Sequence, residues 1–311
     1  MSSKIRTDIK SAIRLLQEGQ LVAIPTETVY GLGGDATRDD VIARIFAAKG
    51  RPQFNPLIIH VSGIRGAEKL VDINEHAQKL IEKFWPGPLT LVLPRKSDAK
   101  ISLLAASGLP TLAVRAPNHA MTRELLAALP FPLAAPSANI SGHLSPTLPR
   151  HVEKLGGQVA MILDGGRCEI GLESTVLDLS EAKPRILRAG FATKEEIENL
   201  IGPVEVAKEN NAIKSPGMML KHYAPKTPLR LTIDQPKNNE GLLAFGKNIP
   251  SGFKAVKNLS ESGNLIEAAA NLFAHLHELD QMNLSRIAVM PIPNEDLGIA
   301  INDRLKRAAH S

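Results

Sequence analysis

Cysteine and aromatic residues are scarce in this chain. Cys168 is its only cysteine, which excludes an internal disulfide and a cysteine-based zinc site. Aromatic residues make up 4% of the 311 residues. They do not interleave with a tract rich in lysine and arginine, so the pattern alone does not indicate an RNA-binding module.

Signals for a membrane or for export are also missing. No apolar run approaches the roughly 18 residues that a membrane-spanning helix needs. The N-terminal segment is charged and lacks the continuous apolar core of a signal peptide. We therefore expect a cytoplasmic protein that makes no membrane contact.

The remaining composition is that of an ordinary globular protein, with 43% hydrophobic and 22% charged residues. The length predicts about two domains. The net charge of +5 leaves two interpretations open. It reflects either a solvated basic surface or attraction to the phosphates of a nucleotide or RNA.

Helix and strand patterns alternate through the first two-thirds of the chain. Apolar residues recur at helical spacing over 9–16, between Asp8 as a start signal and Gly19 as a stop signal. Further helices are predicted at 39–49, which Gly50 ends, and at 74–84, which Asn74 opens. Short apolar strands are predicted at 21–24, 57–61, 89–93, 111–114, 161–163, 175–179 and 185–187. This rhythm predicts an α/β domain with a twisted sheet over residues 1–202.

A weakly periodic segment, 203–227, follows and is predicted to be a linker. Strand patterns then return at 229–233, 241–245, 253–256 and 287–290. Helix patterns cover 265–279 and a final segment that ends near 309. Residues 228–311 are therefore predicted to form a smaller, Rossmann-like α/β domain.

Hydroxyl groups and glycines follow the strand at 21–24. Thr26 and Thr28 offer hydroxyl donors, and Gly31, Gly33 and Gly34 allow the backbone to approach a ligand closely. A solvent-facing turn rich in glycine would have the same composition. The segment matches neither the P-loop nor the dinucleotide-binding fingerprint.

Basic side chains stand at several candidate ligand positions. Lys49 and Arg51 form a possible clamp on a polyphosphate, although Lys49 alone is explained by its place at a helix end. Arg115 at a strand end can hold a carboxylate or form a surface ion pair. His60 lies within an apolar strand, where a histidine is either a ligand or a satisfied core residue.

A third group of polar residues follows the apolar stretch 131–135. Ser137, Asn139 and Ser145 suit either an anion cradle or a turn cluster. Asp164 and Glu173 could assist a metal ion or serve as turn residues, and no metal site is predicted. Cations and hydroxyls without a covalent nucleophile suit phosphoryl or nucleotidyl transfer, in which positioning and charge stabilisation dominate.

Taken in order, these segments resemble the YrdC-like family, in the two-domain form of the threonylcarbamoyl-AMP synthases. The matching segments are 25–36, 49–61, 84–93, 112–119, 132–142, 173–179 and 186–190, with 215–225 in the linker. The resemblance covers about Ile9 to Pro225. Beyond it, the C-terminal part matches in size and pattern. The resemblance implies a mixed sheet in the first domain and a linker that covers the active site.

The resemblance also implies an activity. Such enzymes condense L-threonine, bicarbonate or CO₂, and ATP into L-threonylcarbamoyladenylate and pyrophosphate. The product serves threonylcarbamoyladenosine formation in tRNAs that read ANN codons. Mg²⁺ would accompany ATP, and tRNA or a downstream tRNA-modifying transferase would be a possible partner.

Residue roles follow from the same resemblance. Lys49 and Arg51 would be catalytic. The threonine site would comprise Thr28, His60, Arg115, Ala135 and Ser174. The ATP site would comprise Arg51, Asn55, Thr111, Ser137, Asn139, Ser145, Arg188 and Tyr223. Ala189 departs from the proline that usually follows the arginine at position 188.

Alternative functions belong to other classes. A non-catalytic RNA-binding module would bind tRNA rather than ATP and threonine. A carbamoyltransferase of the hydrogenase-maturation type would require cysteine zinc fingers, which a single cysteine excludes. A regulatory or docking role of the C-terminal domain is compatible with an enzyme.

Overall fold

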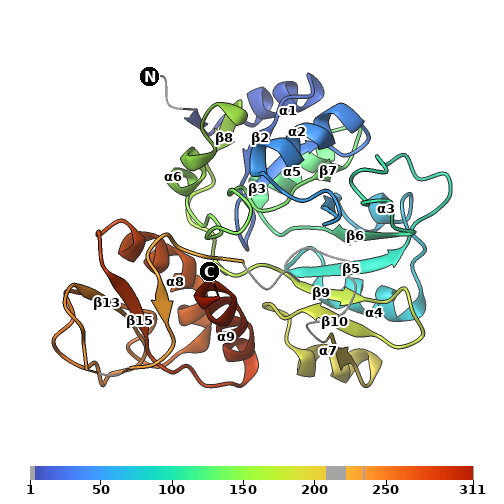
Figure 1. The fold of residues 1–311 in the computed structure, drawn as a ribbon. Helices are drawn as coiled ribbons and strands as arrows, with labels where there is room; N and C mark the ends of the chain where they lie inside the picture. Colours follow the sequence, from blue (N-terminus) through green and yellow to red (C-terminus); the bar gives the residue numbers. More distant parts are fainter. Residues whose placement is uncertain (1–3, 208–221, 234, 311) are drawn as a thin grey trace.

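The computed structural model describes residues 4–207, 222–233 and 235–310 (Figure 1). Of the predicted linker 203–227, the stretch 208–221 lies outside the described residues, as does most of the matching segment 215–225. Within the described ranges, no helix is long and apolar enough to cross a membrane.

The larger unit is built on a mixed sheet, as predicted. In the described part of the chain, eleven strands pair in the order β1-β8-β2-β3-β7-β4-β6-β5-β9-β10-β11. They are β1 (Ile5–Arg6), β2 (Val22–Ile24), β3 (Gly31–Asp35), β4 (Ile58–His60), β5 (Leu89–Pro94), β6 (Thr111–Arg115), β7 (Leu133–Ala134), β8 (Met161–Leu163), β9 (Thr175–Asp178), β10 (Arg185–Arg188) and β11 (Glu205–Val206). Parallel and antiparallel pairs alternate irregularly along this order.

Helices cover the larger sheet, and side chains cap α1, α4 and α7 at their N-termini. The helices are α1 (Ile9–Gln17), α2 (Asp39–Lys49), α3 (Ile64–Ala67), α4 (Glu75–Phe84), α5 (Ala120–Ala128), α6 (Pro149–Val152), the 3₁₀ helix η1 (Glu153–Gln158) and α7 (Lys194–Ile201). Asp8 caps α1 by accepting from the Lys10 amide, and Asn74 caps α4 through the Ala77 amide. Gly50 ends α2 in the left-handed conformation.

Alternation along β2 divides the core between the two faces of this sheet. Val22 and Ile24 pack in one cluster with residues of α1 and α5. Ala23 points to the opposite face and belongs to the larger cluster that includes α2 and α4. Helices on both faces leave the strand ends and their loops to form the site.

The smaller unit contains a four-stranded sheet in its described part, and all neighbouring strands are parallel. Its strands are β12 (Leu229–Arg230), β13 (Glu240–Ala244), β14 (Ala255–Asn258) and β15 (Arg286–Val289), and its helices are α8 (Leu265–Asp280) and α9 (Asp296–Ala309). This confirms the predicted smaller α/β fold, although β12 is shorter than the predicted 229–233.

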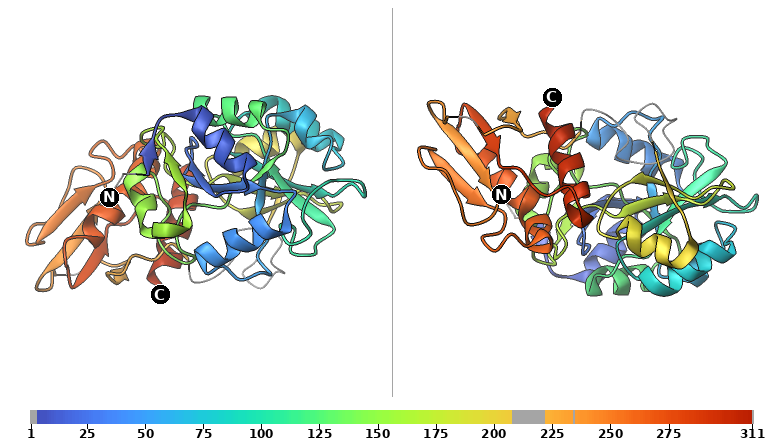
Figure 2. Two further views of the ribbon diagram at one scale, coloured as in Figure 1. Left: turned by 90° about the horizontal axis from the view of Figure 1, so that it is seen from above. Right: turned by 90° about the horizontal axis from the view of Figure 1, so that it is seen from below.

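The two units pack against each other through a shared core. Leu144 and Leu172 of the larger unit, together with Tyr223, belong to the same buried cluster as residues of α8 and α9. Figure 2 shows the smaller unit beside the larger one in both views, and the dark red helix α9 lies on the side that faces the larger unit. The C-terminal helix therefore lies close to the loops of the larger sheet.

One segment that the sequence predicted to be a loop is a strand. Gly31–Asp35 forms β3, which pairs antiparallel with β2 and β7. A Cβ atom on Gly34 would lie 2.6 Å from Cγ1 of Val41 in α2. The glycines therefore allow a helix to pack directly on the strand, and the loop prediction missed this because glycine carries no alternating pattern.

Candidate active site

A cavity lies where β4, β6 and β10 end and where the loops after β2 and β7 meet. Its lining includes nine of the residues predicted from the sequence: Thr28, Arg51, His60, Arg115, Ala135, Ser137, Ser174, Arg188 and Tyr223. The fold thus gathers segments that are more than a hundred residues apart in the sequence. The polar segments after the strands therefore lie around one cavity.

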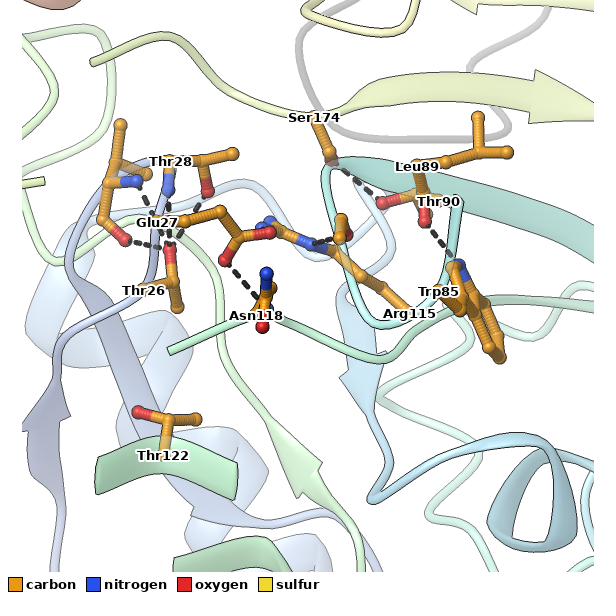
Figure 3. Close-up of polar contacts among 12 residues, drawn as sticks. Thr26, Glu27, Thr28, Trp85, Leu89, Thr90, Arg115, Asn118, Thr122 and Ser174 are labelled. Carbon is orange, nitrogen blue, oxygen red and sulfur yellow. Dashed lines mark hydrogen bonds and ion pairs between the residues drawn. The ribbon is translucent and has the colours of Figure 1, made fainter. Parts of the chain in front are cut away.

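Arg115 is held by a buried ion pair. Its Nη2 lies 2.7 Å from Oε1 of Glu27, and its Nε donates to the Gly87 carbonyl at 3.1 Å. Both side chains are 5% exposed, and Figure 3 shows them facing each other. The second oxygen of Glu27 accepts from the Asn118 amide at 3.0 Å. The guanidinium is therefore fixed and charged, with donors left for another carboxylate.

Hydroxyl groups lie on either side of this pair. The Thr26 and Thr28 hydroxyls are 2.8 Å apart, and Thr26 also donates to the Val29 carbonyl. On the other side, the Ser174 hydroxyl lies 2.7 Å from that of Thr90 on β5 (Figure 3). These contacts orient Thr28 and Ser174 at the cavity wall.

His60 is buried beside Arg115 and is neutral. Burial, with a smaller contribution from Arg115, lowers the pKa of His60 to about 3. Its Nδ1 faces the Ile58 carbonyl at 3.4 Å. An Nδ1–H in this position leaves Nε2 as an acceptor for an N–H or O–H group.

Three buried cations lie close together, and none of them forms an ion pair with a residue that the structure describes. Ion pairs engage Arg115 and Arg304 in the described ranges, whereas none there engages Lys49, Arg51 or Arg188. Burial lowers the pKa of Arg51 to about 9, and nearby Arg188 contributes. Burial and Arg51 hold the pKa of Lys49 well below its usual value, and burial lowers the pKa of Arg188. Uncompensated buried charge is costly, so this cluster is suited to a polyanion.

Hydrogen bonds to oxygens hold these cations in place. Lys49 Nζ donates to the Ser137 and Asn139 carbonyls at 2.5 and 2.6 Å. Arg51 donates to both oxygens of Asn55, and Arg188 donates to the Ser174 carbonyl at 2.9 Å. Lys49 and Asn55 therefore support the wall from behind rather than lining it.

Other predicted residues also lie off the cavity. Ser145 donates to Oε1 of Glu173, and Asn139 lines a separate cavity between the two units. Thr111 is at the opposite end of β6 from Arg115. Thr111 is not among the residues that line this cavity.

Sequence reasoning misses several residues in or beside the cavity wall. Glu27 lies behind the wall on Arg115, and its place between Thr26 and Thr28 is the signal that could have found it. The sequence offers Glu173 as a metal or turn residue, whereas in the structure its carboxylate pairs with Arg304 at 2.9 Å. His222 lies next to Tyr223 and lines the same cavity. Spacing along the sequence does not show which distant charged residue pairs with which.

The described residues offer no cluster of side chains suited to holding a metal ion. Among the described residues, no group of three or more histidine, cysteine, aspartate or glutamate side chains could hold a metal ion. Asp164 accepts from the Gly166 amide at 2.9 Å, as a turn residue does.

The cavity itself is small, with about 40 Å³ of free volume. That is room for about three water molecules, whereas ligand pockets usually measure about 300–1,000 Å³. The rings of His222 and Tyr223 form part of its wall and are buried.

Comparisons with known proteins agree on one family. A family profile described as telomere recombination (Sua5, YciO and YrdC) matches residues 14–190. A second, described as threonylcarbamoyl-AMP synthase, C-terminal domain, matches residues 192–310. The threonylcarbamoyl-AMP synthase of Bacillus subtilis (strain 168) is 40% identical, with 97% of this chain and 92% of the relative covered. The chain belongs to the threonylcarbamoyl-AMP synthase family.

Further similarities to this synthase family extend over both units. The threonylcarbamoyl-AMP synthase of Pyrococcus abyssi is 41% identical, with 97% of this chain and 94% of the relative covered. A crystal structure of Pyrococcus abyssi Sua5 complexed with L-threonine superposes with a TM-score of 0.90 and 38% identity, covering 97% of this chain and 94% of that one. As a member of this synthase family, the chain is a nucleotidyltransferase that uses ATP.

Proposed function

We propose that this chain condenses L-threonine, bicarbonate or CO₂, and ATP into L-threonylcarbamoyladenylate and pyrophosphate. The observation that supports this most is the cluster of Lys49, Arg51 and Arg188, three buried cations without an acidic partner in the described ranges. The cluster adjoins a pocket that contains the fixed Arg115 and hydroxyl donors. The cluster suits a polyphosphate, and the pocket around Arg115 suits a small amino acid.

The half that contains Arg115 is the proposed threonine site. Arg115 binds the threonine carboxylate, while Glu27 keeps the guanidinium in position. Neutral His60 accepts a hydrogen bond from threonine, and the hydroxyls of Thr28 and Ser174 complete the site. The small side chain of Ala135 forms part of the wall of this site. The related Pyrococcus abyssi structure holds L-threonine, which supports this ligand.

The half that contains the cation cluster is the proposed ATP site, with Ser137, Asn139, Ser145, Asn55, Thr111 and Tyr223 as further members. The threonine amine takes up CO₂ to give a carbamate. A carbamate oxygen attacks the α-phosphorus, and the bond to the β-phosphate oxygen breaks as pyrophosphate leaves. Lys49, Arg51 and Arg188 stabilise the negative charge on the phosphates. No enzyme nucleophile is needed.

Mg²⁺ is proposed to arrive as part of the Mg–ATP substrate. Mg²⁺ commonly binds substrate phosphates and water with only one or two carboxylates from the protein. The cavity's acidic side chain, Glu173, is already engaged by Ser145 and Arg304.

ATP binding requires a wider cavity than the one described. We propose that His222 and Tyr223 withdraw when ATP binds and that Tyr223 then contacts the nucleotide. The free volume of about 40 Å³ supports this, because a nucleotide does not fit within it.

The wider context is carried over from the resemblance. The product would serve tRNA threonylcarbamoyladenosine modification in the cytoplasm, with tRNA or a tRNA-modifying transferase as a possible partner. We propose that the chain divides into a catalytic domain (1–202), a linker (203–227) and a C-terminal domain (228–311), and the two separate sheets support this division.

Pyrophosphate release tests the proposed reaction. The purified protein should release pyrophosphate from ATP only when both threonine and bicarbonate are present. Release that persists without either one would contradict the proposal. Calorimetric titrations with ATP and threonine, compared with tRNA, distinguish this enzyme from an RNA-binding module.

Arg51 provides a test of the ATP half. Arg51→Ala should weaken ATP binding about tenfold or more, since a hydrogen bond to a charged group contributes about 1.5–3 kcal/mol. Arg44→Ala is a matched control, because Arg44 is an exposed arginine on α2. Normal ATP binding by Arg51→Ala would remove Arg51 from the proposed site.

A further inference from the structure

Arg304 is a buried arginine that the smaller unit inserts toward the active site. It lies on α9 and is 1% exposed, although it carries a charge. Figure 1 shows α9 at the junction with the larger unit. A charged side chain is seldom buried this far unless it is paired.

The Arg304 guanidinium contacts three segments of the proposed site. Its Nε donates to Oε2 of Glu173 at 2.9 Å, next to Ser174. Its Nη2 donates to the Ala189 carbonyl at 2.8 Å, next to Arg188. Its central carbon lies 5.1 Å from the centre of the Tyr223 ring. One side chain of the C-terminal unit thus joins the proposed threonine site, ATP site and linker.

The pairing of Glu173 determines the charge of the cavity. Among the described residues that line the cavity, Glu173 is the one acidic side chain. Its Oε2 binds Arg304 and its Oε1 accepts from Ser145. Arg188 donates to Ser174 instead of to this carboxylate. Burial favours a higher pKa for Glu173, but Arg304 and Arg188 outweigh it and keep the pKa below its usual value.

Without Arg304, the unpaired Glu173 carboxylate would disturb the ATP site in two ways. It would attract Arg188, which already lies close enough to lower the pKa of Glu173, and so draw that guanidinium away from the phosphates. It would also repel the phosphates directly, and like charges in a site of low dielectric interact strongly. Both effects weaken the binding of a polyanion.

We propose that Arg304 is a positioning residue for the ATP site, which neutralises Glu173 so that Arg188 stays available to the phosphates of ATP. This inference rests on the proposed function and gives the C-terminal unit a role in it. Arg304 does not contact the reacting atoms. It acts through Glu173, Ala189 and Tyr223.

A double-variant comparison tests the inference by steady-state kinetics. Arg304→Met should raise the KM for ATP about tenfold or more, because it leaves a buried carboxylate unpaired, with a smaller change in kcat. Glu173→Gln/Arg304→Met replaces both members of the ion pair with uncharged side chains, so no carboxylate is left unpaired beside Arg188, and the KM should return to within about threefold of the wild-type value. An unchanged KM in Arg304→Met, or a double variant no better than it, would overturn the inference.

Control variants separate this role from a structural one. Arg230→Met breaks the buried pair of Arg230 and Glu240 within the C-terminal unit, whose nitrogen and oxygen are 2.8 Å apart. It should lower stability without raising the KM for ATP, and a comparable rise would overturn the inference. If Arg304→Met does not fold, Arg304→Lys and the double variant decide the question. In both variants the charges at positions 173 and 304 sum to zero, as in the wild type, so a raised KM in either overturns the inference.

Failure of the proposed function would look different. In that case the wild-type protein itself would form no threonylcarbamoyladenylate. If the inference alone fails, the wild type stays active, but the KM values for ATP of the variants do not follow the expected rise and recovery.

Discussion

At the scale of single residues, the site depends on which buried charges are paired and which are not. Arg115 and Arg304 each have a buried carboxylate partner, in Glu27 and Glu173. Lys49 has backbone carbonyls as its partners. A paired arginine is fixed in place, whereas a cation without an acid partner gains most from an anionic ligand.

Glu27→Gln should therefore destabilise the protein and weaken threonine binding. The substitution leaves Arg115 as a buried charge without its partner, and breaking such a pair costs about 3–5 kcal/mol. The free energy of unfolding in urea and the KM for threonine measure the two effects. Glu75→Gln is the control, because the Glu75–Lys79 pair is exposed on α4 and its loss should change the free energy of unfolding little. A loss for Glu27→Gln no larger than that of the control would contradict the account.

The sequence was informative about residue types but not about partners. Position at the end of an apolar strand predicted that Arg115 was a carboxylate-binding candidate. Its ion pair with Glu27 joins residues 88 apart in the chain, and no local pattern records such a distance. Arg304 was missed for the same reason, since nothing in its helix indicates contact with Glu173.

At the scale of elements, glycines allow segments of the site to approach closely. A Cβ atom on Gly190 would lie 2.4 Å from the Thr175 amide nitrogen and 2.6 Å from the Glu173 carbonyl oxygen. These are backbone atoms, which cannot move aside as a flexible side chain can. The loop after β10 is therefore packed directly on the segment that carries Ser174.

Gly190→Ala should displace that segment. We expect a loss of about 1–3 kcal/mol in the free energy of unfolding, as for other overpacked sites, together with a raised KM for threonine or ATP. Gly157→Ala is the control, because a Cβ atom there meets nothing within 4 Å. Equal stability of the two variants would show that the loop is not packed as described.

Elements with local signals were predicted well. Asp8, Asn74 and Gly50 mark helix ends that the structure reproduces, because capping depends on neighbouring residues only. β3 was missed because its glycines gave no alternating pattern. Its pairing with β2 and β7 depends on contacts from elsewhere in the fold.

At the scale of the whole molecule, two histidines join the units. His151 on α6 stacks on His277 of α8 with ring centres 3.8 Å apart, and the His277 Nε2 faces the Ser145 carbonyl at 3.1 Å. Burial lowers the pKa of His151 to about 2 and that of His277 to about 4. Both rings are therefore neutral where the units meet.

Acid should weaken this contact. The unfolded chain binds protons at these histidines below about pH 6.5, whereas the folded protein resists them. Their contribution is therefore fully present above about pH 6.5 and falls as the pH drops toward about 4. The free energy of unfolding, measured in urea from pH 7.5 to pH 5, should decrease. His277→Gln, which keeps an N–H for Ser145, should show a smaller decrease, and an equal one would contradict the assignment.

The two-unit arrangement could be anticipated from the sequence, but its consequence for the site could not. Strand and helix patterns after residue 228 indicated a second α/β fold, and the structure contains it. The patterns did not show that α9 would insert Arg304 between Glu173 and Tyr223. Packing between distant elements decides that placement.

The most direct test of the account is mass spectrometry of the product with labelled bicarbonate. The purified protein, given ATP, Mg²⁺, L-threonine and ¹³C-bicarbonate, should form threonylcarbamoyladenylate that is heavier by the mass of the label. No labelled product should form when threonine is omitted, because there is then no amine to take up CO₂ as a carbamate. Formation of AMP or ADP alone, with no labelled adenylate, would contradict the central claim.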